Sequence, residues 1–459
     1  MKIPNTICAI SSPAGVGAIA LIRVSGKEAV SIVDRCLHKE TDFIRLPAQQ
    51  VKFSEFFDGD ILIDQVVVTK FIAPHSYTGE DIVEISCHGS SFIQKRIMET
   101  LIQQGAQLAN PGEFTMRAFL NGKLDLPQSE AIADLIESQS EMSHKLALKQ
   151  LKGSFSHDIK ELHSKFLDFA SLLELELDFS EEDVQFADRS QLSDLLRQIK
   201  TEVQSLLLSF KLGNVLKNGI PVAIIGKPNV GKSTLLNALL NDDKAIVSHI
   251  PGTTRDAIED VCNIGNVTFR FIDTAGIRTS EDEIENFGIE RTYKTIEKAD
   301  IILYIIDITL TSLEEIESEI EFLENEIQLA DKKLIIIANK IDELSEMPHH
   351  FSQWNKYNVI YISAKRKVNL NYISDVLTEY VANRKIADQT LLTNTRHYDI
   401  MTHILQSIEQ IEQGFSEQLP TDLITIEVRN ALHYLGQIIG EITTDDILEN
   451  IFGRFCIGK

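Results

Sequence analysis

The chain has 459 residues, of which 43% are hydrophobic, and its 44 Lys and Arg residues face 68 Asp and Glu residues, a formal net charge of −24. The length predicts about three domains, and the apolar content is typical of a soluble globular protein. A surface this acidic does not attract a phosphate backbone in bulk. Composition therefore excludes a protein that holds nucleic acid through its overall charge.

The cysteines are odd in number, and no two have the spacing of a zinc knuckle or a redox-active pair. We therefore expect free thiols and a cytoplasmic location, where the surroundings are reducing. No apolar run before Arg23 resembles a signal peptide. No stretch approaches the roughly 18 uncharged apolar residues of a membrane span, so we expect no membrane association. The cysteines are Cys8, Cys36, Cys87, Cys262 and Cys456.

Residues 1–120 mix short β-type runs with helix. Residues 17–25 and 65–72 are rich in β-branched side chains, which predicts strands. Residues 90–104 predict a helix that the following glycine ends. This part of the chain therefore predicts an α+β domain.

From residue 129 apolar side chains recur at steps of three and four, the period of amphipathic helices. Three such stripes predict an α-helical domain over residues 121–218, with Gly213 as the end of its last helix. The stripes are Ile132, Leu135, Ile136, Met142, Leu146 and Leu151; Ile159, Leu162, Phe166, Phe169, Leu173 and Leu177; and Leu192, Leu195, Ile199, Val203, Leu206 and Phe210.

Residues 219–381 alternate short apolar runs with helical stretches, which predicts a parallel sheet covered on both faces. After residue 382 the chain is helical again. We therefore expect the α/β unit to be inserted into the helical domain. The predicted strands are 221–225, 267–272, 301–306, 333–338 and 359–362, and the later helices centre on 398–413, 423–435 and 445–452.

A phosphate-binding loop, Gly226-Lys-Pro-Asn-Val-Gly-Lys-Ser233, follows the first of these strands and opens a helix. Its glycines let backbone N–H groups turn toward phosphates, and the helix N-terminus adds a favourable field. Lys232 would neutralise the β and γ phosphates, and the Ser233 hydroxyl would bind Mg²⁺.

Two further segments suit the γ-phosphate and its metal. Asp273-Thr-Ala-Gly276 ends the strand at 267–272, where Asp273 can hold Mg²⁺ through water and the Gly276 N–H can meet the γ-phosphate. Upstream, Gly252-Thr-Thr-Arg-Asp256 offers Thr254 as a ligand that reaches Mg²⁺ only while the γ-phosphate is present.

The base is predicted to bind at the ends of the last two strands. Asn339-Lys-Ile-Asp342 provides a carboxylate on Asp342 that accepts two hydrogen bonds from the guanine edge, and Lys340 would pack along the base. Ser363-Ala-Lys365 would offer a backbone N–H to the guanine oxygen. Because open α/β sheets bind ligands at the carboxyl ends of their strands, we expect these motifs to converge on GTP.

The predicted GTP-binding residues include the loop, the switch segment and the strand ends. They are Asn229, Val230, Gly231, Lys232, Ser233, Thr234, Ser248, His249, Ile250, Pro251, Gly252, Thr253, Thr254, Asp273, Thr274, Ala275, Gly276, Asn339, Lys340, Asp342, Ser363, Ala364 and Lys365, with Ser233 and Thr254 as the Mg²⁺ ligands.

Hydrolysis needs a group that orients the attacking water, and many GTPases place a glutamine directly after Asp-x-x-Gly. Here Ile277 occupies that position and can neither donate nor accept. Glu285, Arg255 and Arg278 are candidates, and the residues alone do not choose among them. A positive charge in the arginine-finger role contributes about 10³–10⁵ in rate, so we expect a cation to be recruited.

Three motifs outside the nucleotide site are distinctive. They are Pro74-His-Ser-Tyr-Thr-Gly-Glu-Asp81, Asn110-Pro-Gly-Glu-Phe-Thr-Met-Arg-Ala-Phe-Leu-Asn-Gly-Lys-Leu-Asp125 and the C-terminal Phe455-Cys-Ile-Gly-Lys459. Together with residues 252–256 they extend over the whole chain. In this order they closely resemble the MnmE (TrmE) family of tRNA-modification GTPases.

The resemblance implies a multidomain architecture. An α+β folate-binding-like domain at residues 1–120 would form a constitutive homodimer. A helical domain at 121–218 and 382–459 would hold an inserted Ras-like α/β P-loop GTPase domain of the TrmE type at 219–381. By matching motif positions, a reduced folate (5-formyl- or methylene-tetrahydrofolate) would contact Arg23, Glu80 and Lys123, with Lys459 nearby.

The resemblance also implies how hydrolysis is catalysed. A K⁺ ion would lie beside the phosphates in the place of an arginine finger, and Glu285 matches the water-orienting glutamate of the family. The G domains of the dimer would meet across their nucleotide faces. The implied K⁺ ligands are Asn229, Ser248, Ile250 (through its carbonyl) and Thr253, and the implied catalytic residues are Glu285, Lys232 and Cys456.

The family acts with an FAD-dependent partner, MnmG (GidA), in a heterotetramer. Together they install carboxymethylaminomethyl or aminomethyl groups on carbon 5 of wobble uridine in tRNA, using a one-carbon unit from methylene-tetrahydrofolate. An acidic chain fits a partner that supplies basic surface. The Cys456 thiol is either exposed and reactive or a small buried apolar side chain, and the residues leave both possibilities open.

Two alternatives compete with this function. A ribosome-assembly GTPase switch would share the Asn229 loop and a hydrophobic residue at position 277. Such proteins usually carry a basic RNA-binding module, whereas residues 382–459 hold six Lys or Arg and eleven Asp or Glu. A folate-dependent one-carbon transferase with a regulatory G domain would place its catalysis in residues 1–120.

Overall fold

The computed structural model describes residues 5–180, 189–240, 246–247, 260–272, 295–312, 314–315, 317–318, 321, 332–344, 359–382, 390–453 and 455–458. The chain divides into two compact units. One comprises Met1–Ala133, Gln150–Ile199 and His403–Lys459, and the other comprises Asp134–Lys149 and Lys200–Thr402. No helix in the described ranges combines the length and the apolar character needed to cross a bilayer.

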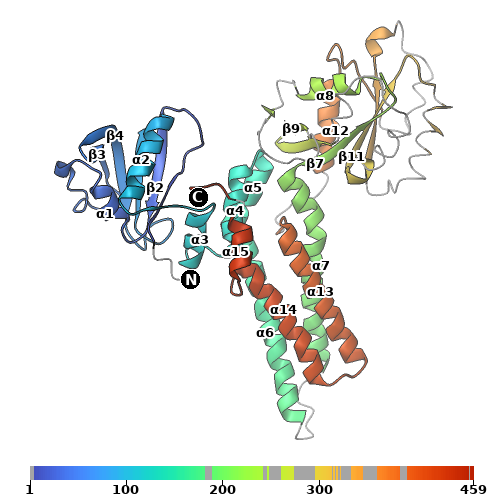
Figure 1. Ribbon diagram of the computed structural model, residues 1–459. Helices are drawn as coiled ribbons and strands as arrows, with labels where there is room; N and C mark the ends of the chain where they lie inside the picture. Colours follow the sequence, from blue (N-terminus) through green and yellow to red (C-terminus); the bar gives the residue numbers. More distant parts are fainter. Residues whose placement is uncertain are drawn as a thin grey trace. The chain divides into compact units, whose positions relative to one another are not determined.

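A six-stranded sheet forms the N-terminal domain, with strand order β3-β4-β5-β2-β1-β6 (blue in Figure 1). Neighbouring strands run antiparallel, except that β1 and β6 are parallel. The elements are β1 (Ile7–Ile10), β2 (Ile19–Ser25), α1 (Ala29–Asp34), η1 (Lys39–Thr41), β3 (Val51–Asp58), β4 (Ile61–Phe71), β5 (Ile82–His88), α2 (Ser91–Gln103), β6 (Gln107–Leu108) and α3 (Glu113–Leu120).

The core of this domain lies between the sheet and its helices. Ile97 and Leu101 of α2 are buried together with Ile22 of β2 and Val68 of β4, because alternate strand residues and every third or fourth helix residue face the same interior. The strands predicted at 17–25 and 65–72 and the helix predicted at 90–104 are confirmed as β2, β4 and α2.

The helices before the insertion are α4 (Leu126–Glu137), α5 (Glu141–Leu151), α6 (Ser154–Ser180) and α7 (Arg189–Asn218). The first predicted stripe is therefore divided between two helices. Ser140 and Ser143 explain the break, because the N–H of each donates to the side-chain oxygen of the other, at 3.1 and 3.2 Å. This reciprocal pair is a capping box, which starts a new helix.

The helices after the insertion are α13 (Thr395–Ser416), α14 (Thr421–Ile439) and α15 (Asp445–Phe452), at the three predicted positions. α14 lies along α6 (Figure 1), and Phe169 of α6 meets Phe415 edge to face at 6.3 Å between ring centroids. Helices from both sides of the insertion thus pack together. The helical domain is discontinuous in sequence, as predicted.

The inserted α/β domain has a seven-stranded sheet of order β13-β12-β11-β7-β10-β9-β8. The five predicted strands are all present and mutually parallel. The antiparallel pairing of β9 and β8 beyond them was not predicted. The elements are β7 (Ile220–Ile225), α8 (Lys232–Leu240), β8 (Ile246–Val247), β9 (Asp260–Ile264), β10 (Val267–Phe271), β11 (Ile301–Asp307), β12 (Lys333–Asn339), η3 (Ile341–Glu343), β13 (Val359–Tyr361) and α12 (Leu370–Ala382).

Apolar side chains cover both faces of this sheet. On one face Val222 and Leu303 pack with residues of α8 and α12, including Leu235 and Leu377 (Figure 1). On the other face Ala223, Ile302 and Ile336 form a separate cluster. Burial on both sides explains why these strands are continuously apolar in sequence.

Gly213 does not end α7, contrary to the prediction, because the helix continues to Asn218. A Cβ atom at Gly213 would lie 2.2 Å from the Leu392 carbonyl oxygen. Phe210, one turn earlier, stacks on Tyr398 at 4.4 Å between centroids. The glycine therefore serves close approach of the segment that leads into α13, rather than helix termination.

Because of this contact, we expect Gly213→Ala to lower stability, whereas the same change in an exposed helix raises it. In an exposed helix interior the change stabilises by about 1 kcal/mol, but here the new methyl group meets a backbone carbonyl and should destabilise by about 1–3 kcal/mol. Thermal unfolding followed by circular dichroism should show a lower midpoint for Gly213→Ala, with Ser205→Ala on the exposed face of α7 close to the wild type. A raised midpoint would contradict the packing role.

Candidate nucleotide-binding site

The phosphate-binding loop joins β7 to α8, as predicted. Its glycines are required by close approach: a Cβ at Gly226 would lie 2.2 Å from the Ile305 carbonyl oxygen, and one at Gly231 would lie 2.3 Å from Asn339 Nδ2. Both residues have positive φ, 149° and 103°, as does the exposed Asn229 at 63°. This backbone is the kind that turns N–H groups toward an anion at a helix N-terminus.

Lys232 holds its ammonium group over this loop. Its Nζ donates to the carbonyl oxygens of Gly226 and Lys227, both at 2.7 Å. Burial lowers the pKa of Lys232. A partly desolvated ammonium is attracted more strongly to a phosphate than one in water. Ser233 and Thr234, at the start of α8, are exposed, so their hydroxyls are accessible to a metal or phosphate.

Asn339 connects the phosphate loop to the loop after β13. Its side chain is buried, and its Nδ2 donates to the Val230 carbonyl oxygen at 2.8 Å. Its Oδ1 accepts from the Ala364 N–H at 3.0 Å. One amide thus fixes two of the predicted nucleotide-binding loops to each other, and both lie at the carboxyl ends of parallel strands.

Lys340 follows Asn339 in the left-handed conformation, with φ 70°. Its Nζ pairs with Asp307 Oδ2 at 2.5 Å. The Asp307 carboxyl is nearly buried, and although burial alone would raise its pKa, hydrogen bonds from Lys340 and Thr309 lower it. Asp307 was not predicted as a site residue. The sequence could have indicated this residue, because Asp307 ends an apolar strand at the same sheet edge as Asn339.

Asp342, the predicted guanine acceptor, lies in η3 directly after Lys340. A side-chain hydrogen bond from Ser363 lowers its pKa, and Arg366 Nε lies 3.3 Å from its Oδ2. The carboxylate is therefore ionised, the state that accepts hydrogen bonds from the guanine edge. Ser363 is fully buried and pairs through its backbone with Val368, which fixes the loop that carries Ala364 and Lys365.

Several predicted residues lie outside the described part of the chain. They are Ser248, His249, Ile250, Pro251, Gly252, Thr253 and Thr254 of the switch segment, Asp273, Thr274, Ala275 and Gly276, the hydrolysis candidates Glu285, Arg255 and Arg278 with Ile277, and Lys459.

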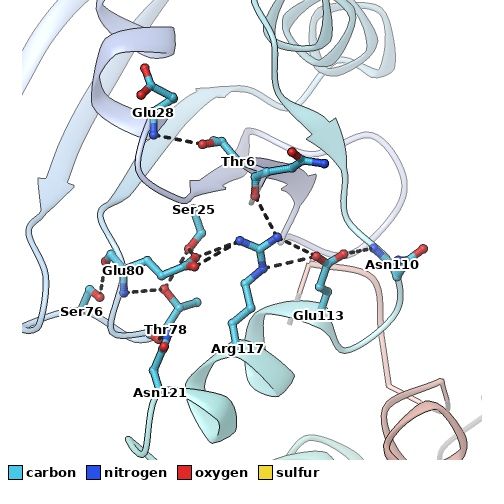
Figure 2. A network of polar contacts seen from close by, with 11 residues as sticks. Thr6, Ser25, Glu28, Ser76, Thr78, Glu80, Asn110, Glu113, Arg117 and Asn121 are labelled. Atoms are coloured by element: carbon cyan, nitrogen blue, oxygen red, sulfur yellow. Dashed lines mark hydrogen bonds and ion pairs between the residues drawn. The ribbon is translucent and has the colours of Figure 1, made fainter. Parts of the chain in front are cut away.

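A second cluster of charged residues lies in the N-terminal domain (Figure 2). Arg117 of α3 is 1% exposed, and its guanidinium lies between two carboxylates, 3.0 Å from Glu80 and 2.8 Å from Glu113. Glu80 also accepts from the Ser25 hydroxyl, which in turn bonds Thr78. Glu80, a predicted folate contact, is thus charge-compensated. Arg117 was missed although it lies inside a recognised motif.

The other predicted folate contacts lie on neighbouring segments. Arg23 of β2 pairs with Glu84 at 2.7 Å and lies over the rings of Tyr77 and Phe114. Lys123 Nζ donates to the Pro74 carbonyl oxygen at 3.0 Å. The segment after α3 is thereby tied to the loop of residues 74–81, which holds Glu80.

The C-terminal tail lies against the N-terminal domain within the same compact unit. The Ser11 hydroxyl donates to the Gly458 carbonyl oxygen at 3.0 Å, and the Gly112 N–H donates to that of Cys456 at 3.4 Å. Gly458 has φ 94°, and a Cβ there would lie 2.4 Å from the Ile10 carbonyl oxygen. The Cys456 thiol is exposed, and the thiols of the other four cysteines are buried.

Two family models match this chain: "GTP-binding protein TrmE N-terminus" over residues 6–123 and "MnmE helical domain" over residues 126–456. A protein of Christiangramia forsetii described as "tRNA modification GTPase MnmE" is 47% identical, with all of both chains covered. Proteins with the same description from Flavobacterium psychrophilum and Flavobacterium johnsoniae are 45% and 47% identical, each over 99% of both chains.

Proposed function

Because this chain belongs to the MnmE family of tRNA modification GTPases, we propose that it hydrolyses GTP to drive modification of carbon 5 of wobble uridine in tRNA. The observation that carries this proposal is similarity along the entire chain to proteins of that description. The convergence of Lys232, Asn339 and Asp342 on one sheet edge supports a guanine nucleotide as the ligand.

Each residue of the proposed nucleotide site has its own role in binding. Lys232 neutralises the β and γ phosphates, and the hydroxyls of Ser233 and Thr254 bind Mg²⁺, which would offset charge on the phosphate oxygens. Asp342 selects guanine because its carboxylate accepts from the ring N–H and the exocyclic amino group, a pair of donors that adenine lacks. The loop glycines keep backbone N–H groups close to the phosphates.

We propose that K⁺ stimulates hydrolysis from a site beside the phosphates, with Asn229, Ser248, Ile250 and Thr253 as its ligands. Glu285 orients the attacking water, a role that Ile277 cannot take. Support comes from the exposed, left-handed Asn229 in the loop. If Glu285→Ala weakened GTP binding while leaving turnover intact, this role for Glu285 would be wrong.

We further propose four functional parts with the boundaries expected from sequence: 1–120, 121–218, 219–381 and 382–459. The first binds a tetrahydrofolate derivative through Arg23, Glu80, Lys123 and Lys459, and it mediates homodimerisation. An FAD-dependent partner of the MnmG type completes a heterotetramer in the cytoplasm. The tail contact with Ser11 and Gly112 supports a site shared by the two ends of the chain, with Cys456 accessible beside it.

Exchange of K⁺ for Na⁺ at equal ionic strength should slow GTP hydrolysis by about a hundredfold or more, because a cation in the arginine-finger role contributes about 10³–10⁵ in rate. Phosphate release by the full chain under saturating GTP measures this effect. Choline chloride serves as the control for ionic strength. Equal rates in K⁺ and Na⁺ would remove the ion from the mechanism.

The tRNA modification has a direct test in cells. Nucleosides from digested tRNA of cells lacking this chain should contain no carboxymethylaminomethyl or aminomethyl groups at carbon 5 of wobble uridine, as measured by mass spectrometry. Re-expression of the wild-type chain should restore them. Unchanged tRNA nucleosides together with accumulated ribosomal precursors would favour a ribosome-assembly switch instead.

A further inference from the structure

Asp307 is the last residue of β11, at the sheet edge where the nucleotide loops meet. It is the strand partner of Asn339, the last residue of β12, and it is 3% exposed. A carboxyl group so deeply placed at the end of an apolar strand requires partners, because an unpaired buried charge is costly.

The partners of Asp307 occupy both carboxylate oxygens. Oδ1 accepts from the N–H of Thr309 at 3.0 Å and from its hydroxyl at 2.6 Å. Oδ2 pairs with Lys340 Nζ at 2.5 Å. The backbone is fixed as well, because the Asp307 carbonyl oxygen accepts from the N–H and hydroxyl of Thr311. The side chain is therefore held by Thr309 and Lys340, and the backbone by Thr311.

This arrangement restrains Lys340 at both ends. Its backbone is left-handed, a conformation that few residues other than glycine adopt, and its ammonium is bound to Asp307. The four-carbon stem between them is the part predicted to pack along the purine. A free lysine side chain samples many rotamers, and nucleotide binding would otherwise have to remove that freedom.

We infer that Asp307 is a positioning residue for the base: it holds Lys340 extended before the nucleotide arrives and so raises affinity for purine nucleotides. The inference rests on the proposed nucleotide site. Asp307 contacts neither phosphate nor base itself. Its effect passes through Lys340, whereas selection of guanine belongs to Asp342.

The expected change in affinity follows from the cost of immobilising the Lys340 side chain, which Asp307 reduces before the nucleotide binds. Immobilising one flexible side chain at an interface costs about 0.5–1.5 kcal/mol, which corresponds to about two- to twelvefold in affinity. Asp307→Asn should therefore weaken GDP binding by roughly three- to tenfold. If the ion pair instead competed with the nucleotide for Lys340, the same change would tighten binding, so the direction separates the two roles.

The experiment measures dissociation constants of the full chain for GDP and for inosine diphosphate, which lacks the 2-amino group that Asp342 recognises. Asp307→Asn should weaken both nucleotides by the same factor, leaving their ratio at the wild-type value. Thr309→Val, at an exposed residue, removes one hydrogen bond to the same carboxylate and should produce a smaller loss in the same direction. Asp194→Asn, the same chemical change at an exposed carboxylate of α7 that pairs with Arg197 at 3.3 Å, is the matched control and should change neither constant.

A double-mutant cycle separates positioning from loss of structure. In a Lys340→Ala background, Asp307→Asn should change GDP affinity by less than about twofold, whereas a structural defect would weaken binding there too. Unchanged or tighter GDP binding by both Asp307→Asn and Thr309→Val, or an undiminished loss in the Lys340→Ala background, would overturn the inference. A wild-type chain without affinity for GDP would overturn the proposed function as well.

Discussion

The buried amide of Asn339 is the interaction on which the nucleotide site depends. Its two ends bind the Val230 carbonyl oxygen and the Ala364 N–H, so the phosphate loop and the base loop share one rigid connection. Gly231 makes this possible, because any side chain there would displace the amide. Asn339 of β12 is in turn the strand partner of Asp307 at the end of β11. The distance between the phosphate and base sites is thus set by neighbouring parallel strands.

Local pattern predicted much of this fold, for a physical reason. Strand burial on both faces produces continuous apolar runs, and amphipathic helices produce steps of three and four, so the five parallel strands and the helical domain could be read from neighbouring residues. The prediction for Gly213 was wrong because this glycine makes room for the Leu392 carbonyl, a contact with a residue far along the chain. The break at Ser140 depended on a reciprocal cap, and β8 and β9 are too short to show a clear period.

The candidate sites were predicted less evenly. The phosphate loop, Asn339, Lys340 and Asp342 follow a spacing that the chemistry requires, so they could be predicted from sequence as candidate nucleotide-binding residues. Asp307 pairs with Lys340, and Arg117 pairs with Glu80 as well as with the nearby Glu113, so one contact of each residue joins segments that are distant in sequence and was not predicted. The contacts of Arg117 also bear on the proposed folate site of the N-terminal domain. Glu80 enters any proposed folate contact as a carboxylate that already accepts hydrogen bonds from the Arg117 guanidinium and the Ser25 hydroxyl.

The central claim is that these strand-end loops bind a guanine nucleotide. Isothermal titration of the purified full chain with GDP and with ADP, each with Mg²⁺, tests it most directly. The account predicts one GDP per chain and ADP binding at least about a hundredfold weaker, because a site built for specific hydrogen bonds rejects a base that lacks the matching donors. Equal affinity for the two nucleotides, or no uptake of GDP, would contradict it.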